Sequence, residues 1–172
     1  MCSMLVGVMS DSHDNLSKID SAVKAFTEAK VDMIIHLGDY IAPFSLARVL
    51  KSGIRFIGVL GNNDGERLGL KEIASKAGQE LQDPPYEMTI NGKRILLLHG
   101  FGPRDRTVGI VEKIARGGGY HVILYGHTHE VDVRVEGGTL ILNPGEVFGG
   151  LSGRSTVAIL DLDMMKAKVI DI

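Results

Sequence analysis

Sulfur and aromatic side chains are scarce in this chain. Cys2 is the single cysteine among 172 residues, so a disulfide within the chain is excluded and a zinc site made of several thiolates has almost no basis. We expect Cys2 to be a terminal residue without a special role. Tryptophan is absent and aromatic residues make up 5 % of the chain, so a base-stacking platform for single-stranded nucleic acid is not expected.

Strong net charge and long apolar runs are also missing. The formal net charge of −2 argues against a surface that wraps a nucleic-acid polymer, although it is compatible with a small phosphorylated substrate. No apolar run approaches the ~20 residues that cross a bilayer, and no basic segment followed by an apolar run suggests a signal peptide. We therefore expect a cytoplasmic protein that does not bind membranes.

A chain of 172 residues is most simply one domain, residues 1–172. With 44 % hydrophobic residues it can bury a core. Its first half alternates short apolar runs with stretches of helical spacing, and its second half contains hairpin signals such as Asn91-Gly92. This order predicts mixed sheets with helices outside them. The expected helices are 16–26, 43–51, 66–77 and 106–116, and the expected strands lie within 4–10, 31–39, 54–61, 86–90, 93–100, 121–129, 131–146, 155–163 and 167–172.

Polar clusters follow five of the expected strands. In open α/β sheets, ligands bind beyond the carboxyl ends of the strands, so five such ends can converge on one spot. The clusters are Asp11-Ser12-His13, Gly38-Asp39, Gly61-Asn62-Asn63-Asp64, His99-Gly100 and Gly126-His127-Thr128-His129.

The side chains of these clusters are suited to metal ions. Imidazole nitrogens, carboxylates and an amide oxygen, with no thiolate, favour manganese, iron, zinc or nickel over a thiolate-preferring metal. Seven donors are more than one four-coordinate ion needs, and they are natural for two ions that share a bridging carboxylate. The seven are Asp11, His13, Asp39, Asn62, His99, His127 and His129.

In this order, the motifs DSH, GD, GNND, HG and GHTH resemble those of the calcineurin-like metallophosphoesterases across essentially the whole chain. The short length and the run Asn143-Pro144-Gly145-Glu146 resemble the small phosphodiesterases of the YfcE/MJ0936 type. The resemblance implies an α/β fold, a four-layer sandwich of two mixed β-sheets flanked by helices, with two divalent metal ions at one edge. It also places residues 143–146 beside the site, where their backbone would support the metal ligands.

Residue by residue, the resemblance implies two coordination groups that share Asp39 as a bridge. The first ion would bind Asp11, His13, Asp39 and His129, and the second would bind Asp39, Asn62, His99 and His127.

Asn63 departs from the family pattern, because many members have histidine there as a proton donor or phosphate contact. An amide can hydrogen-bond a phosphoryl oxygen but cannot act as a general acid at neutral pH. We therefore expect esters with good leaving groups, or protonation of the leaving group by water or another side chain. Asp64 and Gly65 are expected only to turn the chain.

Several other polar residues allow two interpretations. Arg104, with Arg106 near it, is the best candidate for a cation that contacts the substrate, and a solvated loop arginine is an equal alternative. His36 is expected to be a buried, hydrogen-bonded histidine and not a ligand. We expect Glu130 and His121 to face solvent.

The leading interpretation is a metal-dependent phosphodiesterase in which a hydroxide between two ions, most simply manganese, attacks phosphorus. Diesters are favoured over monoesters, because a dianionic monoester gains from cationic contacts that the sequence hardly offers. Alternatives are a phosphomonoesterase, a nuclease, or a non-catalytic scaffold like Vps29, which need not retain the seven donors. The partners expected are a small phosphodiester and, by resemblance, further copies of the chain in a dimer or higher oligomer.

Overall fold

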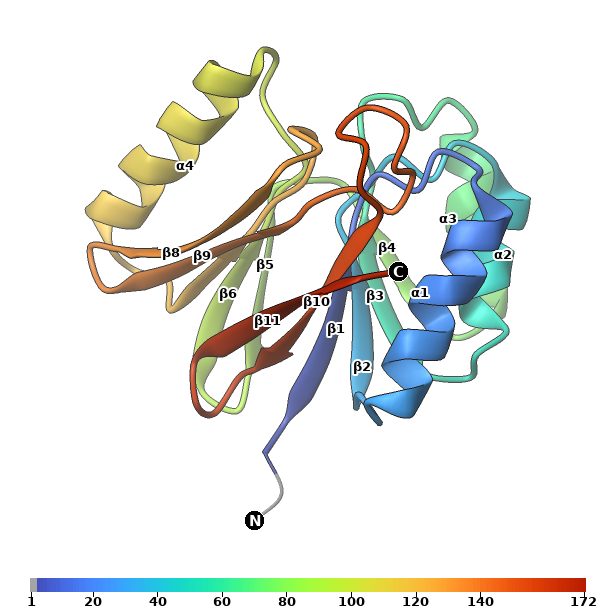
Figure 1. Ribbon diagram of the computed structural model, residues 1–172, viewed down its shortest axis with the longest axis horizontal. Helices are drawn as coiled ribbons and strands as arrows, with labels where there is room; N and C mark the ends of the chain where they lie inside the picture. The colour runs from blue at the N-terminus through green and yellow to red at the C-terminus, as the bar shows by residue number, and fades with distance from the viewer. Residues whose placement is uncertain (1–2) are drawn as a thin grey trace.

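The computed structural model describes residues 3–172, and Cys2 lies outside this range. Two β-sheets face each other in this structure, and helices cover the outer face of each (Figure 1). The six-stranded sheet has the strand order β11-β10-β1-β2-β3-β4, and the five-stranded sheet has the order β5-β6-β7-β9-β8.

The six-stranded sheet has a parallel centre with an antiparallel hairpin at one side. Strands β1 (Leu5–Met9), β2 (Met33–His36), β3 (Arg55–Val59) and β4 (Glu80–Gln82) run parallel. Strands β10 (Thr156–Asp161) and β11 (Lys166–Asp171) pair antiparallel, and β10 also pairs antiparallel with β1. The expected strands of this sheet are confirmed. The structure adds β4, which the sequence did not predict because three residues carry too short a pattern.

The five-stranded sheet also mixes parallel and antiparallel pairs. It contains β5 (Tyr86–Ile90), β6 (Lys93–Leu97), β7 (Val122–Leu124), β8 (Val131–Glu136) and β9 (Thr139–Pro144). Strands β6, β7 and β9 run parallel, and hairpins join β5 to β6 and β8 to β9. Asn91 and Gly92 have φ of 48° and 74°, the positive values that the predicted type I′ turn requires.

The four helices follow the predicted segments closely. They are α1 (Leu16–Glu28), α2 (Pro43–Leu50), α3 (Arg67–Lys76) and α4 (Arg104–Gly117), the last beginning two residues before its expected start. The Asn15 side chain accepts a hydrogen bond from the Lys18 amide at 3.3 Å, so it caps α1 as expected. None of the described helices is long and apolar enough to cross a membrane.

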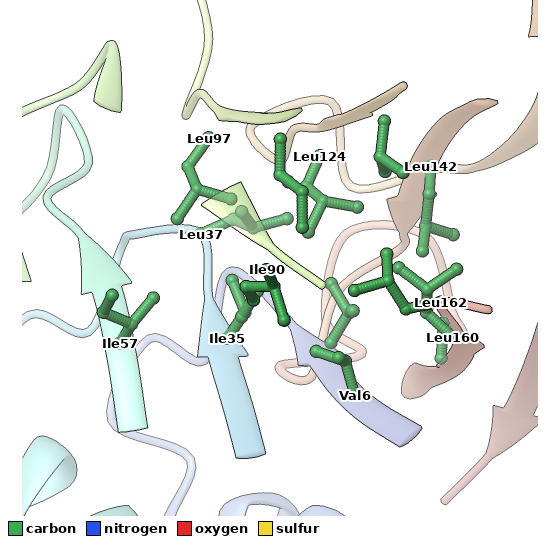
Figure 2. Packing of buried hydrophobic residues seen from close by; sticks show 14 of the residues in the cluster. Val6, Ile35, Leu37, Ile57, Ile90, Leu97, Leu124, Leu142, Leu160 and Leu162 are labelled. Carbon is green, nitrogen blue, oxygen red and sulfur yellow. The ribbon is translucent and has the colours of Figure 1, made fainter. Parts of the chain in front are cut away.

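Three apolar layers separate the sheets and helices, which confirms the four-layer α/β sandwich. Figure 2 shows the layer between the two sheets, where side chains such as Val6, Ile35 and Leu124 meet. A second layer lies under α1, α2 and α3, and includes Phe26. A third layer, which includes Val111, joins α4 to the five-stranded sheet. These layers fix the strand ends, and with them the polar loops that follow.

Candidate metal centre

The backbone around the expected metal ligands is unusually strained. Asp11, His13, Asp39, His127 and His129 all have positive φ, between 41° and 68°. This left-handed region costs an L-residue roughly 1–2 kcal/mol, and residues held there cluster at functional sites. Five of the seven expected ligands are therefore held in this conformation.

Gly38 allows the loops to approach closely. Its φ is +100°, and a Cβ atom there would lie 2.7 Å from both the Gly61 amide nitrogen and Nδ1 of His99. Any side chain at position 38 would therefore push apart the turns that carry Asp39, Asn62 and His99.

Asp11, His13 and His129 form the first half of the site. Oδ1 of Asp11 lies 3.4 Å from Nε2 of His129 and 3.9 Å from Nε2 of His13. Oδ2 of Asp11 is held by the Ser10 hydroxyl and by the His127 amide at 3.0 Å, which fixes the carboxylate. Burial, the largest influence, raises the pKa of Asp11 above its ordinary value.

Two buried atoms of this half lack a hydrogen-bond partner, Oδ1 of Asp11 and Nε2 of His13. Leaving a polar atom buried and unpaired is costly, and such atoms in a native fold require an explanation. A divalent cation between them would satisfy both, so the residues of this half fit a metal ion. Asp11, His13 and His129 also offer one donor atom each within 4.8 Å of one another.

Asn62, His99 and His127 form the second half of the site. Oδ1 of Asn62 lies 2.9 Å from Nε2 of His99 and 2.8 Å from Nδ1 of His127. The other ring nitrogens donate to backbone carbonyls, His99 to Leu37 at 2.6 Å and His127 to Gly102 at 2.6 Å. In the neutral rings, the remaining lone pairs therefore point at the amide oxygen, an arrangement that a cation stabilises.

A proton on His99 can take the place of such a cation. Burial opposes protonation of His99, but the hydrogen bond to Asp39 and the charges of Asp11 and Asp39 outweigh it and raise the pKa of His99 to about 9. A proton and a metal ion would compete for the same lone pair, because a ligating imidazole must be deprotonated.

Asp39 lies between the two halves. Its Oδ2 is 3.4 Å from Nε2 of His99 and 3.6 Å from Nε2 of His13, so one carboxylate faces both groups. Burial opposes its ionisation, but the hydrogen bond and charge of His99 and the bonds from Asn63 hold the pKa of Asp39 well below its usual range. Asp39 is thus an anionic carboxylate that faces His13 of the first half and His99 of the second.

Asn63 and Asp64 both fasten Asp39. The Asn63 amide donates to Oδ1 of Asp39 at 2.8 Å, and its side-chain Nδ2 donates to Oδ2 at 2.7 Å. The buried carboxylate of Asp64 accepts from the amides of Asp39 at 3.0 Å, Gly61 at 2.6 Å and Ile41 at 2.9 Å. Asp64 therefore does more than turn its own loop, because it joins the loops that carry Asp39 and Asn62.

Glu146 is a supporting residue that the sequence analysis missed. It is fully buried, and its Oε2 accepts a hydrogen bond from Nδ1 of His129 at 2.7 Å, which leaves Nε2 of that ring facing Asp11. Its Oε1 accepts from the amides of Leu151 at 3.0 Å and Ser152 at 2.5 Å. We expected the backbone of residues 143–146 to support the site, whereas the contact comes from the Glu146 side chain.

The remaining predictions have mixed outcomes. Arg104 pairs with Glu130 at the surface, and its guanidinium contacts none of the seven donors in the described structure. His36 is fully buried and confirmed as a hydrogen-bonded histidine, with Nδ1 accepting from the Gly38 amide at 3.2 Å and Nε2 meeting the Ser12 hydroxyl at 3.0 Å. His121 is exposed, as expected, and accepts from the Arg94 amide.

Known proteins resemble this chain over nearly its full length. Phosphodiesterase MJ0936 of Methanocaldococcus jannaschii is 34 % identical over 161 residues, which cover 93 % of this chain and 94 % of that protein. The probable metallophosphoesterase MJ0623 of the same organism is 32 % identical over 148 residues, 83 % of this chain and 68 % of that protein.

Solved structures also match this chain over nearly its full length. A novel archaeal phosphodiesterase superposes with a TM-score of 0.90 at 32 % identity, covering 98 % of this chain and all of that one. At lower identity the match shows the fold alone: YfcE, a phosphoesterase from E. coli, gives a TM-score of 0.69 at 19 % identity and covers 98 % of this chain and 100 % of that one. Zinc-bound Vps29 from Entamoeba histolytica gives 0.67 at 18 % identity and covers 98 % of this chain and 99 % of that one.

The family model of the calcineurin-like phosphoesterase superfamily domain matches residues 4–165. This match includes every strand except β11 and every polar strand end described above. The chain therefore belongs to the calcineurin-like phosphoesterase superfamily.

Proposed function

We propose that this chain is a phosphodiesterase that uses two divalent metal ions. Asp11, His13 and His129 would hold one ion, Asn62, His99 and His127 would hold the other, and Asp39 would bridge them. The observation that carries the proposal is the pair of buried, unpartnered atoms, Oδ1 of Asp11 and Nε2 of His13, beside a carboxylate that faces both halves.

Two such ions, when bound, would polarise the phosphoryl oxygens and lower the pKa of water enough for it to attack phosphorus at neutral pH. The bond from phosphorus to the leaving oxygen breaks on the opposite side. The donor set suits manganese, nickel, zinc or iron, and manganese is the simplest assignment because carboxylate and imidazole ligands are compatible with it.

The chain's own residues would position the reaction. Glu146 holds the His129 ring with Nε2 facing Asp11, and Asp64 holds the turn of Asp39. Asn63 can donate a hydrogen bond to a phosphoryl oxygen when it releases Asp39, but it has no proton to give to the leaving group. Esters whose leaving groups are stable as anions should therefore react fastest.

Diesters fit this site better than monoesters. A monoester dianion carries an additional negative charge on the scissile phosphate and gains most from cationic side chains that contact it. Arg104, the cation expected to do so, is paired with Glu130, and among the described residues no second cation contacts Glu130 to take its place. A diester carries one charge at phosphorus, which the two ions would neutralise.

A scaffold role is the second candidate, because the fold matches Vps29. The two candidates differ in turnover. Metal-stripped protein is resupplied with manganese, nickel or zinc and assayed with bis-p-nitrophenyl phosphate beside p-nitrophenyl phosphate, with Asp39→Ala as the control.

Metal-dependent cleavage that favours the diester and disappears in Asp39→Ala is the expected result. Circular dichroism establishes that each protein tested is folded. If folded wild-type protein hydrolyses neither ester with any of the three metals, the proposed phosphodiesterase activity is refuted and the scaffold role is favoured.

A further inference from the structure

A small cavity opens beside the second half of the candidate metal centre. Its volume is about 220 Å³. This is less than the ~300 Å³ at which pockets for whole drug-sized ligands begin, so it suits one part of a substrate. Its walls come from the loops after β3, β4 and β6 and from the first residue of α3. They comprise Leu60, Gly61, Asn62, Arg67, Asp83, Pro84, His99 and Gly100.

Beyond the expected metal ligands, two charged residues line this cavity, Arg67 and Asp83. The Arg67 guanidinium contacts Oδ1 of Asp83, and Nζ of Lys71 contacts Oδ2 at 2.5 Å. Two cations share one carboxylate, so the three side chains of Arg67, Lys71 and Asp83 together carry one net positive charge. The Arg67 side chain is 49 % exposed, so its guanidinium has donors available to a ligand.

Lys71 allows Arg67 to leave Asp83. The hydrogen bond from Lys71 is the largest influence on Asp83, and together with Arg67 it holds the pKa of that carboxyl below its ordinary value. When Arg67 turns to a ligand, Asp83 keeps a cationic partner. Arginine also presents a planar fork that matches phosphate and carboxylate.

We propose that this cavity binds a second anionic group of the substrate through Arg67. The substrate class is then a phosphodiester whose non-leaving substituent carries a further phosphate or carboxylate. This inference rests on the proposed function, because the scissile phosphate must lie at the candidate metal centre, of which Asn62 and His99 also line the cavity. The second anion lies one group away from phosphorus, so it requires no cation at the scissile phosphate itself.

Two esters with the same leaving group test this proposal. Thymidine 5′-(p-nitrophenyl phosphate) and its 3′-phosphorylated analogue both react with water at the 5′ phosphorus, where the bond to the aryl oxygen breaks and p-nitrophenolate leaves. We expect kcat/KM to be about tenfold higher for the 3′-phosphorylated ester, the ratio that ~1.4 kcal/mol produces.

Four variants identify the source of this ratio. Arg67→Gln should reduce it to about one, and Lys71→Gln should lower it, because Asp83 then retains Arg67. Asp83→Asn should raise it by releasing Arg67. Arg48→Gln is the matched control, because Arg48 is also a half-exposed arginine paired with one aspartate, Asp20, and should leave the ratio unchanged.

Binding gives a readout that does not depend on turnover. Isothermal titration calorimetry measures the Kd of thymidine 3′,5′-bisphosphate and of thymidine 5′-phosphate on manganese-loaded protein, with an expected preference of about tenfold for the bisphosphate. Loss of this preference in Arg67→Gln supports the proposal. A wild-type preference of one, or one that Arg67→Gln leaves intact, overturns it.

The two proposals fail in different ways. If neither ester is hydrolysed while the binding preference depends on Arg67, the proposed phosphodiesterase activity is wrong and the anion-binding site at Arg67 is supported. If both esters are hydrolysed at equal rates, the enzyme stands and the anion site is wrong.

Discussion

Asp11 keeps one carboxylate oxygen buried without a partner, whereas Asn62, on the other side of Asp39, has its amide oxygen 2.9 Å and 2.8 Å from two imidazole nitrogens. In the first half, hydrogen bonds with surrounding groups hold the ligands: the Ser10 hydroxyl and the His127 amide hold Asp11, and Glu146 holds His129. The side chains of the second half contact one another directly.

This difference predicts unequal affinities for the two ions. The first half already holds its donors apart, so a metal ion there gains the full benefit of satisfying buried atoms. In the second half an ion must displace the contacts among Asn62, His99 and His127, and also the proton that the raised pKa places on His99. We expect the ion at Asp11, His13 and His129 to bind more tightly.

Asp39→Ala should have the largest effect, because it removes a carboxylate whose Oδ2 faces His13 of the first half and His99 of the second. Turnover should fall by at least about 10³-fold, and both ions should bind more weakly. Metal content after gel filtration, measured by mass spectrometry, checks the binding. Retention of two ions per chain in the variant would show that Asp39 is not a bridge.

Asn63→His should add a proton donor beside Asp39. A histidine there can protonate a poor leaving group, and general acid catalysis contributes roughly 10²–10⁴-fold. We expect alkyl diesters to gain about 10²-fold in kcat while p-nitrophenyl diesters gain little. An equal gain for both classes would contradict the role given to Asn63.

Glu146→Gln should weaken metal binding at the first half of the site and leave the second half unchanged. The amide can no longer fix the His129 ring as a carboxylate does, and loss of such a partner costs about 10–100-fold in metal affinity. Calorimetric metal titration should show that the tighter step weakens and the weaker step does not change. A change in the weaker step alone would reverse the assignment of the two halves.

His36 provides the smallest expected effect, one of stability. Burial lowers the pKa of His36 to about 3, below the 6.5 of the unfolded chain. The unfolded chain therefore binds one more proton once the pH falls below 6.5, and stability is lost between pH 6.5 and about 3. This contribution is about 1.4 kcal/mol for each pH unit.

Urea unfolding of metal-free protein at pH 7, 6 and 5 measures this slope. His36→Gln should reduce the slope by the stated amount, because glutamine does not titrate. An unchanged slope would mean that another group carries the acid sensitivity. Both ring nitrogens of His36 have partners, whereas Nε2 of His13 has none.

Much of this site could be predicted from the sequence, because it depends on local patterns. Five of the apolar runs end in a polar cluster, and parallel strands place their carboxyl ends at one edge. Asp11, Asp39 and Asn62 were found in this way. The order of the five motifs then carried the resemblance to the family.

The supporting contacts could not be predicted, because they join segments distant in sequence. Glu146 follows a glycine in a run that reads as a turn, and its burial depends on how residues 147–155 fold back over it. The pairing of Arg104 with Glu130 spans 26 residues and depends on side-chain orientation. The cavity at Arg67 depends on the loop after β4, a strand without a visible pattern.

Anomalous diffraction from crystals soaked in manganese tests the central claim most directly. We predict two peaks ~3.5–4 Å apart with Asp39 between them, the first near Asp11, His13 and His129 and the second near Asn62, His99 and His127. A single peak at saturating manganese, or two peaks away from these residues, would contradict the two-metal site.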